Sequence, residues 1–159
     1  MSQRLDYAKQ SPELAKKYGE FSALLRHTNL GAAIKHLVDL RVSQMNGCAF
    51  CVDMHVKEAK IHGERELRLH HVAVWRESPL FDERERAALE WAEALTKLGP
   101  HGVPDDIYNK VLAVFGEKEL SDLSFMVLAI NGWNRLGVGF EMTPGSMDGP
   151  YGLTKSGLS

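Results

Sequence analysis

The sequence predicts an all-α protein that forms one compact domain of six or seven helices. Apolar residues recur every three to four positions along most of the chain, as they do on the buried face of a helix. Runs in which β-branched and polar residues alternate, the pattern of a strand, are nearly absent. With 159 residues, of which 44% are hydrophobic and 25% charged, the chain has the size and composition of a single globular domain.

Three helices are expected in the first part of the chain. The first covers about residues 12–26, because Ser11 is a suitable N-cap and the proline after it is favoured at the first helical position. The second covers about residues 32–45, and Asn46-Gly47 is a typical helix stop. The third therefore begins near Cys48, and it ends before His62.

Four more helices are expected over residues 64–77, 82–98, 104–115 and 118–136. The second of these begins at Asp82, because Asp-Glu-Arg-Glu resembles a capping box with Glu85 at the third helical position. Gly116 separates the last two helices. The connections are short, so successive helices are expected to pack side by side.

The last helix is apolar around most of its circumference, in the segment from Leu123 to Trp133. Such a helix is buried, either within the monomer or against another subunit, so a homo-oligomer is expected. The single domain is expected to span residues 1–159, with its core over residues 12–142. The tail, residues 143–159, is rich in glycine, serine and proline and is expected to be surface-exposed or flexible.

The composition argues against nucleic-acid and membrane partners. The formal net charge is −2, which is not the basic footprint of a nucleic-acid-binding protein. No window approaches ~18 uninterrupted apolar residues, and the polar N-terminus lacks the apolar stretch of a signal peptide. We therefore expect a cytoplasmic protein. In that compartment a close cysteine pair is more often catalytic, redox-sensing or metal-binding than a structural crosslink.

The only two cysteines of the chain lie three residues apart, and a histidine follows four residues after the second. At ~100° per residue, Cys48, Cys51 and His55 share one face of the third helix, and Glu58 continues that face. Neighbours at i and i+3 lie ~5–6 Å apart, within the range that a disulfide tolerates. The pair can therefore open and close as a disulfide without large backbone movement.

The start of a helix favours the thiolate, which is the reactive form of cysteine, because its N–H groups and dipole attract anions. Cys48 is closer to the helix terminus, whereas Cys51 lies one turn from His55 and is the better candidate for activation by a base. A cysteine that attacks an electrophilic oxygen becomes a sulfenic acid, and its neighbour then closes the disulfide. An outside reductant must restore the pair.

Other interpretations of the motif are open. The two cysteines and the histidine could be buried residues of the core. A closed zinc site needs four ligands, and His62, His70 and His71 lack a recognisable ligand spacing. A thioredoxin-type fold is disfavoured because its βαβ pattern is missing. We expect neither a metal nor a cofactor.

Three segments carry a resemblance to a known family: Leu40 to Glu64, Trp75 to Leu98, and Ala129 to Phe140. They resemble the AhpD-like alkylhydroperoxidase branch of the carboxymuconolactone decarboxylase family, and the likeness covers about residues 30–140. The resemblance implies an all-α fold that assembles as trimers or hexamers. It also implies thiol-dependent peroxidase activity, with a hydroperoxide substrate and a dithiol or protein reductant.

The resemblance also implies roles for individual residues. Cys51 matches the peroxidatic nucleophile, Cys48 the resolving cysteine and His55 the histidine of the proton relay. Two positions depart from the pattern, because His36 stands where those peroxidases have a relay glutamate and Phe50 where they have a histidine. His36 can shuttle a proton but cannot supply a negative charge to His55.

Glu58 is a candidate to supply the missing charge, and it completes the expected catalytic set with Cys51, Cys48, His55 and His36. Two other functions stay open. One is a decarboxylase-like small-molecule activity in which the thiols are incidental, and the other is a redox sensor that does not turn over peroxide.

Polar and aromatic residues of other helices have expected roles in packing. Asn131, Asn134 and Arg135 lie on the apolar last helix and need hydrogen-bond partners there. The tryptophans lie on apolar helix faces, where packing is the favoured role: Trp75, Trp91 and Trp133.

Overall fold

A computed structural model of the protein describes residues 3–158, and within that range it contains helices and no strand. The predicted all-α class and single compact domain are therefore confirmed. Met1, Ser2 and Ser159, which the predicted domain included, lie outside the described residues. The helices are α1 (Tyr7–Gln10), α2 (Pro12–Leu25), α3 (Ala32–Asn46), α4 (Ala49–Ile61), α5 (Glu66–His71), α6 (Glu83–Thr96), α7 (Asp105–Gly139) and α8 (Asp148–Tyr151). Two 3₁₀ helices complete the set, η1 (Val72–Val74) and η2 (Leu153–Ser156).

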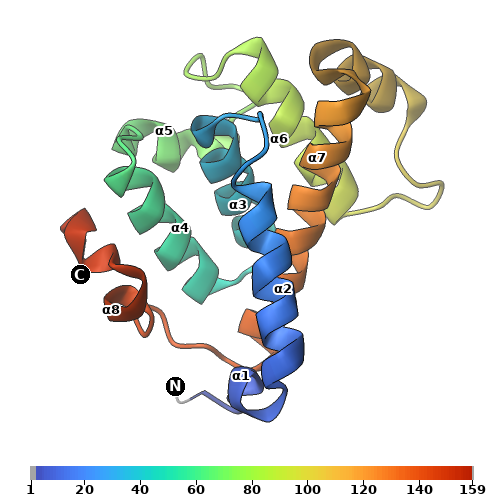
Figure 1. Cartoon of the computed structure of the whole chain (residues 1–159). Helices are drawn as coiled ribbons and strands as arrows, with labels where there is room; N and C mark the ends of the chain where they lie inside the picture. The colour runs from blue at the N-terminus through green and yellow to red at the C-terminus, as the bar shows by residue number, and fades with distance from the viewer. Residues whose placement is uncertain (1–2, 159) are drawn as a thin grey trace.

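Helix α3 is the central element, and it packs against α4, α6 and α7 (Figure 1). The main core lies where α3 meets α6 and α7, around side chains such as Val38, Trp91 and Leu123. A second apolar cluster lies where α3 meets α4 and α5, and it includes Leu37 and Trp75. Because α3 is held on several sides, the side chains that it directs toward α4 have well-defined positions.

The turn between α3 and α4 is short and places Cys48 at the start of α4. Gly47 adopts a left-handed conformation with φ 67°. The N–H of Gly47 donates to the carbonyl of Gln44 at 3.2 Å, and the N–H of Cys48 donates to the carbonyl of Ser43 at 3.0 Å. These two bonds form a Schellman motif, in which a side chain at the glycine position would be strained. The helix stop predicted at Asn46-Gly47 is confirmed.

Two other boundaries were predicted from local chemistry and are confirmed. The Asp82 side chain accepts from the N–H of Glu85 at 2.8 Å, and the Glu85 side chain accepts from the N–H of Asp82 at 3.0 Å. This capping box starts α6. Gly116 has φ 68° and ψ 171°, so it interrupts α7 at the expected break between two helices.

The helix expected over residues 64–77 is shorter in the structure, where α5 passes into η1 and then into turns. Arg86 of α6 stabilises those turns, because its guanidinium donates to the carbonyls of Trp75, Arg76 and Ser78. The four-residue helix α1, which the sequence analysis did not predict, is capped by Asp6.

Residues 143–158 form α8 and η2, which lie against α4 (Figure 1). Lys57 of α4 contacts Asp148 at 2.7 Å, and Asp53 accepts from the N–H of Gly145 at 3.0 Å. Leu153 is buried in the segment. The segment thus runs over the surface of the bundle and is attached to α4 by charged and apolar contacts.

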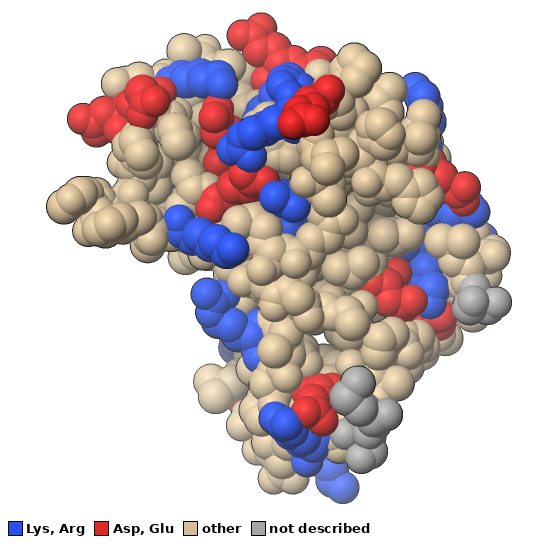
Figure 2. Space-filling view, turned by 180° about the vertical axis from the view of Figure 1, so that it is seen from behind, with Lys and Arg blue, Asp and Glu red and all other residues tan. Residues whose placement is uncertain are grey.

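On the face shown in Figure 2, basic and acidic side chains are interspersed among broad areas of other residues. Within residues 3–158, no helix combines the length and the apolar character that crossing a bilayer requires.

Candidate functional site

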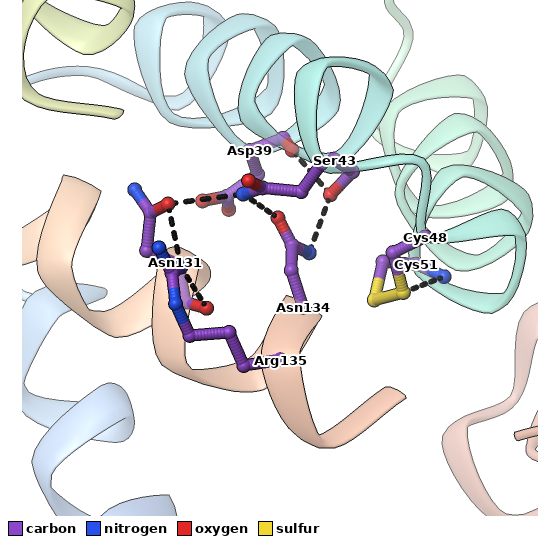
Figure 3. The surroundings of a disulfide bond; sticks show 8 residues. Asp39, Ser43, Cys48, Cys51, Asn131, Asn134 and Arg135 are labelled. Atoms are coloured by element: carbon purple, nitrogen blue, oxygen red, sulfur yellow. Dashed lines mark hydrogen bonds between the residues drawn. A yellow bond between two sulfur atoms is a disulfide. The ribbon is translucent and has the colours of Figure 1, made fainter. Parts of the chain in front are cut away.

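Cys48 and Cys51 are joined by a disulfide at the start of α4, and their Cα atoms are 5.2 Å apart. Cys48 is the N-cap of α4, and its Sγ accepts from the N–H of Cys51 at 3.3 Å (Figure 3). Both side chains are buried, with 1% of their surface exposed. The expected placement of Cys48 at a helix start and the pairing of the two thiols are both present in the structure.

The disulfide is covered from several directions. Helix α7 comes so close that a Cβ on Gly137 would lie 2.7 Å from the Sγ of Cys48 and 3.3 Å from that of Cys51. Phe50 is buried beside the two cysteines. Methionines from α4 and from the chain after α7 complete this apolar cover: Met54, Met142 and Met147. A reagent must therefore displace part of this cover before it can meet either sulfur.

His55 is buried one helical turn beyond Cys51. Among the described residues, neither ring nitrogen has a hydrogen-bond partner. Nδ1 lies 3.5 Å from Oε2 of Glu58 and 4.0 Å from Oδ2 of Asp39. Buried polar groups are nearly always hydrogen-bonded, so an unpaired imidazole between two carboxylates is a mark of a functional site.

The three groups shift one another's protonation. Burial lowers the pKa of His55, but the carboxylates of Asp39 and Glu58 outweigh burial, so its pKa is raised overall. Contact with His55 lowers the pKa of Glu58 to about 2, so this carboxylate is ionised at neutral pH. Burial raises the pKa of Asp39 to about 6, and the nearby His55 offsets only part of that rise. His55 is therefore an imidazole whose charged form the protein stabilises.

His36 lies on α3 and faces the end of α4. Its Nε2 is 2.9 Å from Nδ1 of His62, the C-cap residue of α4. Burial is the main reason that the pKa of His36 is lowered, and the charges of Glu58 and Glu64 oppose it only in part. His36 is thus a buried neutral imidazole that is hydrogen-bonded to an exposed one.

A network of amide side chains joins α3 to α7 beside the disulfide (Figure 3). Asn134 is fully buried, donates to Oγ of Ser43 at 3.0 Å and accepts from Nδ2 of Asn46 at 2.9 Å. The same Asn46 nitrogen donates to Asn131 at 2.9 Å, and Arg135 donates to the Asn131 side chain. The expected need of these residues for partners is met, and the network holds α7 in register over the cysteines.

The structure places the five expected site residues on two adjoining helices. His36 is on α3, Cys48 is the N-cap of α4, and the others are on α4: Cys51, His55 and Glu58. Asp39 was not among the residues predicted for the site, and His62 was predicted only as a histidine without a recognisable zinc-ligand spacing. His36 and Asp39 are one turn apart on α3, but a single sequence carries no signal that this face meets α4.

The tryptophans are packing residues. Trp75 and Trp91 are buried and donate to Glu93 and to Ser124, respectively. Trp133 is half-buried and donates to Ser22 at 2.8 Å. Within residues 3–158, no group of three or more His, Cys, Asp or Glu side chains is arranged to hold a metal ion.

Comparison with known proteins gives matches over most of the chain. A model of the carboxymuconolactone decarboxylase family matches residues 12–94. The uncharacterized protein YdfG of Bacillus subtilis (strain 168) is 36% identical over 138 residues, which are 87% of this chain and 94% of YdfG.

Solved structures share the fold. One is a protein of unknown function from Agrobacterium tumefaciens, described as a candidate AhpD antioxidant defence protein. It is 42% identical with a TM-score of 0.86, over 90% of this chain and 98% of that one. The debrominase Bmp8 has a TM-score of 0.75, over 93% of this chain and 78% of its own. At 16% identity, that likeness concerns the fold alone.

Proposed function

The chain belongs to the carboxymuconolactone decarboxylase family, and we propose that it reduces hydroperoxides with the thiols of Cys48 and Cys51. One observation carries the proposal. His55 is buried one turn beyond Cys51, lacks a hydrogen-bond partner among the described residues, and lies between the carboxylates of Asp39 and Glu58. A base in this position can take the thiol proton and make Cys51 a nucleophile.

The proposed reaction begins when the Cys51 thiol gives its proton to His55. The thiolate attacks the hydroperoxide and breaks its O–O bond, so Cys51 becomes a sulfenic acid and an alkoxide leaves. His55 returns the proton to the alkoxide, which departs as an alcohol. The Cys48 thiol then displaces water from the sulfenic acid, and the disulfide forms.

The second half of the cycle restores the thiols. A dithiol reductant opens the disulfide by two exchange steps and is itself oxidised to a disulfide. The Cys48–Cys51 disulfide of the structure corresponds to the state between the two halves. In this scheme Glu58 supplies the negative charge beside His55, because the relay position of the family carries His36 in this chain.

The Agrobacterium tumefaciens structure supports the proposal, because a protein described as a candidate for antioxidant defence is 42% identical to this chain. We also propose a cytoplasmic location, where dithiol reductants keep thiols reduced, and assembly as a homo-oligomer.

Cysteine variants test the function. In an assay of organic hydroperoxide consumption with an excess of dithiothreitol, Cys51→Ser should reduce turnover by roughly 10³-fold or more, as expected for loss of a nucleophile. Cys48→Ser should not form the internal disulfide, and when it is treated with hydroperoxide in the absence of dithiothreitol it should form one sulfenic acid per chain, which dimedone traps at Cys51 for mass spectrometry.

Three outcomes would reject the proposal. Full activity of Cys51→Ser would show that the thiols are incidental, as in a decarboxylase-like enzyme. A native chain in which peroxide produces a reversible Cys48–Cys51 disulfide, but which does not consume peroxide catalytically, would be a redox sensor. Trapping of the sulfenic acid at residue 48 in Cys51→Ser, with none at Cys51 in Cys48→Ser, would reverse the assigned roles.

A further inference from the structure

Helix α4 carries a line of ionisable side chains from the disulfide to the end of the helix. Cys51, His55, Glu58 and His62 are separated by four, three and four residues, so they share one face of the helix. At ~1.5 Å of rise per residue, the line is about 16 Å long. Its inner end is buried at Cys51, and its outer end is exposed at His62.

Helix α3 places two ionisable side chains opposite the histidines of α4. His36 and Asp39 are one turn apart, and each meets a histidine of α4. Asp39 lies 4.0 Å from Nδ1 of His55, and His36 lies 2.9 Å from Nδ1 of His62. Glu58 lies between the two meeting points along α4, where it contacts His55 and shifts the pKa of His36 upward against burial. These ionisable side chains therefore lie in the same region, between α3 and α4.

The pair of His36 and His62 is suited to passing a proton. The two nitrogens are 2.9 Å apart, so one of them must donate its N–H to the other. A neutral imidazole can accept a proton at one nitrogen and release one from the other, so it can pass a proton along a chain of hydrogen bonds. His36 is buried and His62 is exposed, so this hydrogen bond crosses from the interior to the surface.

The proposed reaction requires a proton to move from solvent to the buried site. A reductant thiol loses its proton in solvent before it attacks Cys48 as a thiolate. The attack breaks the S–S bond and releases the Cys51 thiolate inside the covered site. His55 has already given its proton to the alkoxide, so it must take up a proton from solvent and pass it to this thiolate, although it is itself buried and both sulfurs are covered.

We propose that His36 and His62 form the outer end of a proton relay that connects buried His55 to solvent through Glu58 and Asp39. The inference rests on the proposed function. It assigns to His62 a role for which the family resemblance has no counterpart. The charged groups that face this relay from α2, α3, α4 and the following turn are Arg26, Lys35, Asp39, Glu58 and Glu64.

The test compares His62→Gln with the native chain, because His62 is exposed and glutamine keeps an amide that can hydrogen-bond to His36 but cannot carry a proton. In the peroxide assay at low buffer concentration, His62→Gln should lower kcat roughly tenfold and leave the KM for peroxide unchanged, since proton transfer rather than binding is impaired. Added imidazole should restore kcat, whereas a bulky buffer of similar pKa should not. His101→Gln, which changes another exposed histidine, should behave like the native chain in both buffers.

The outcomes separate this inference from the function on which it rests. Unchanged kcat in His62→Gln, or a loss that imidazole does not restore, would reject the relay while the peroxidase function stands. If the native chain does not consume peroxide, the proposed function fails. The relay is then tested by an NMR measurement that does not require peroxide turnover. Exchange of the His55 ring N–H with solvent, measured by NMR, should then be slower in His62→Gln, and equal exchange rates would overturn the relay.

Discussion

At the scale of single residues, the imidazole of His55 lies between two carboxylates, Glu58 and Asp39, whose pKa values differ. Glu58 has a pKa lowered to about 2 by His55, so it keeps its charge across the physiological range. Asp39 has a pKa that burial raises to about 6, so it takes up a proton just below neutral pH. Because only Glu58 is charged under mildly acidic conditions, it is the carboxylate that keeps His55 basic there.

Replacing Glu58 by glutamine should lower the pKa of His55. A neutral amide no longer stabilises the imidazolium, and burial, which favours the neutral ring, is then opposed only by Asp39. NMR titration of the His55 ring protons in the reduced protein measures this change, and at a pH above the His55 titration of both proteins, where the ring is neutral in each, the weaker base should lower peroxide turnover roughly tenfold.

The matched control for this variant is Glu66→Gln, an exposed carboxylate paired with Lys60. It should leave both the His55 titration and the turnover unchanged. An unchanged or increased pKa of His55 in Glu58→Gln would mean that Asp39 or another group sets its basicity.

At the scale of elements, α4 carries the chemistry and the segment of residues 143–158 helps to cover it. Lys57 holds the segment, because its buried amine lies 2.9 Å from Asp53 and 2.7 Å from Asp148. Met147 lies in the same segment and packs against the cluster of Cys48, Phe50 and Cys51. Attachment of the segment and access to the disulfide are therefore linked.

Replacing Lys57 by methionine should loosen this attachment and speed reduction of the disulfide. Two carboxylates then face each other without a cation, so local opening of the segment becomes easier. The rate of disulfide reduction by dithiothreitol should rise several-fold, which is about 1 kcal/mol of local opening, and hydrogen exchange should increase in residues 143–158.

Lys60→Met is the control for this experiment, because it removes an ion pair of the same helix with Glu66 outside the segment. Equal reduction rates in Lys57→Met and the native chain would show that the segment does not limit access to the sulfurs.

At the scale of the whole molecule, several large apolar side chains are exposed on α2 and α7, which pack against each other. Leu24 is 69% exposed, Leu128 57% and Phe125 50%, and Phe125 makes an edge-to-face contact with Phe21 at 6.1 Å between ring centres. Contiguous exposed apolar residues of this kind mark interaction surfaces. The proposed homo-oligomer, a trimer or hexamer by family resemblance, would bury this face.

Leu128→Glu should reduce the mass of the native assembly in light scattering after gel filtration. A charge in the centre of an apolar interface must be desolvated, so the substitution opposes association by a few kcal/mol. Leu67→Glu, which places a charge at an exposed leucine of α5, should keep the native mass. A native chain that elutes as a monomer would contradict the prediction outright.

Features that depend on neighbours in the sequence were predictable. The Asn46-Gly47 stop, the capping box of Asp82 and Glu85 and the break at Gly116 are each determined by a few consecutive residues. The common face of Cys51 and His55 follows in the same way, because they are one turn apart on one helix. The turns that replace the end of the helix predicted over residues 64–77 were not predictable, since the side chain that binds their carbonyls, Arg86, comes from α6.

The sequence by itself determined the helical class, most helix boundaries and the cysteine motif at the start of α4, because helix periodicity and capping act over a few residues. Only the tertiary structure placed Asp39 beside His55 and His36 beside His62, since these contacts join helices that are separated along the chain. The close approach of Gly137 to both sulfurs was likewise decided by packing. Local interactions therefore place the reactive residues at the start and on one face of α4, and the packing of α3, α4 and α7 determines which groups surround them.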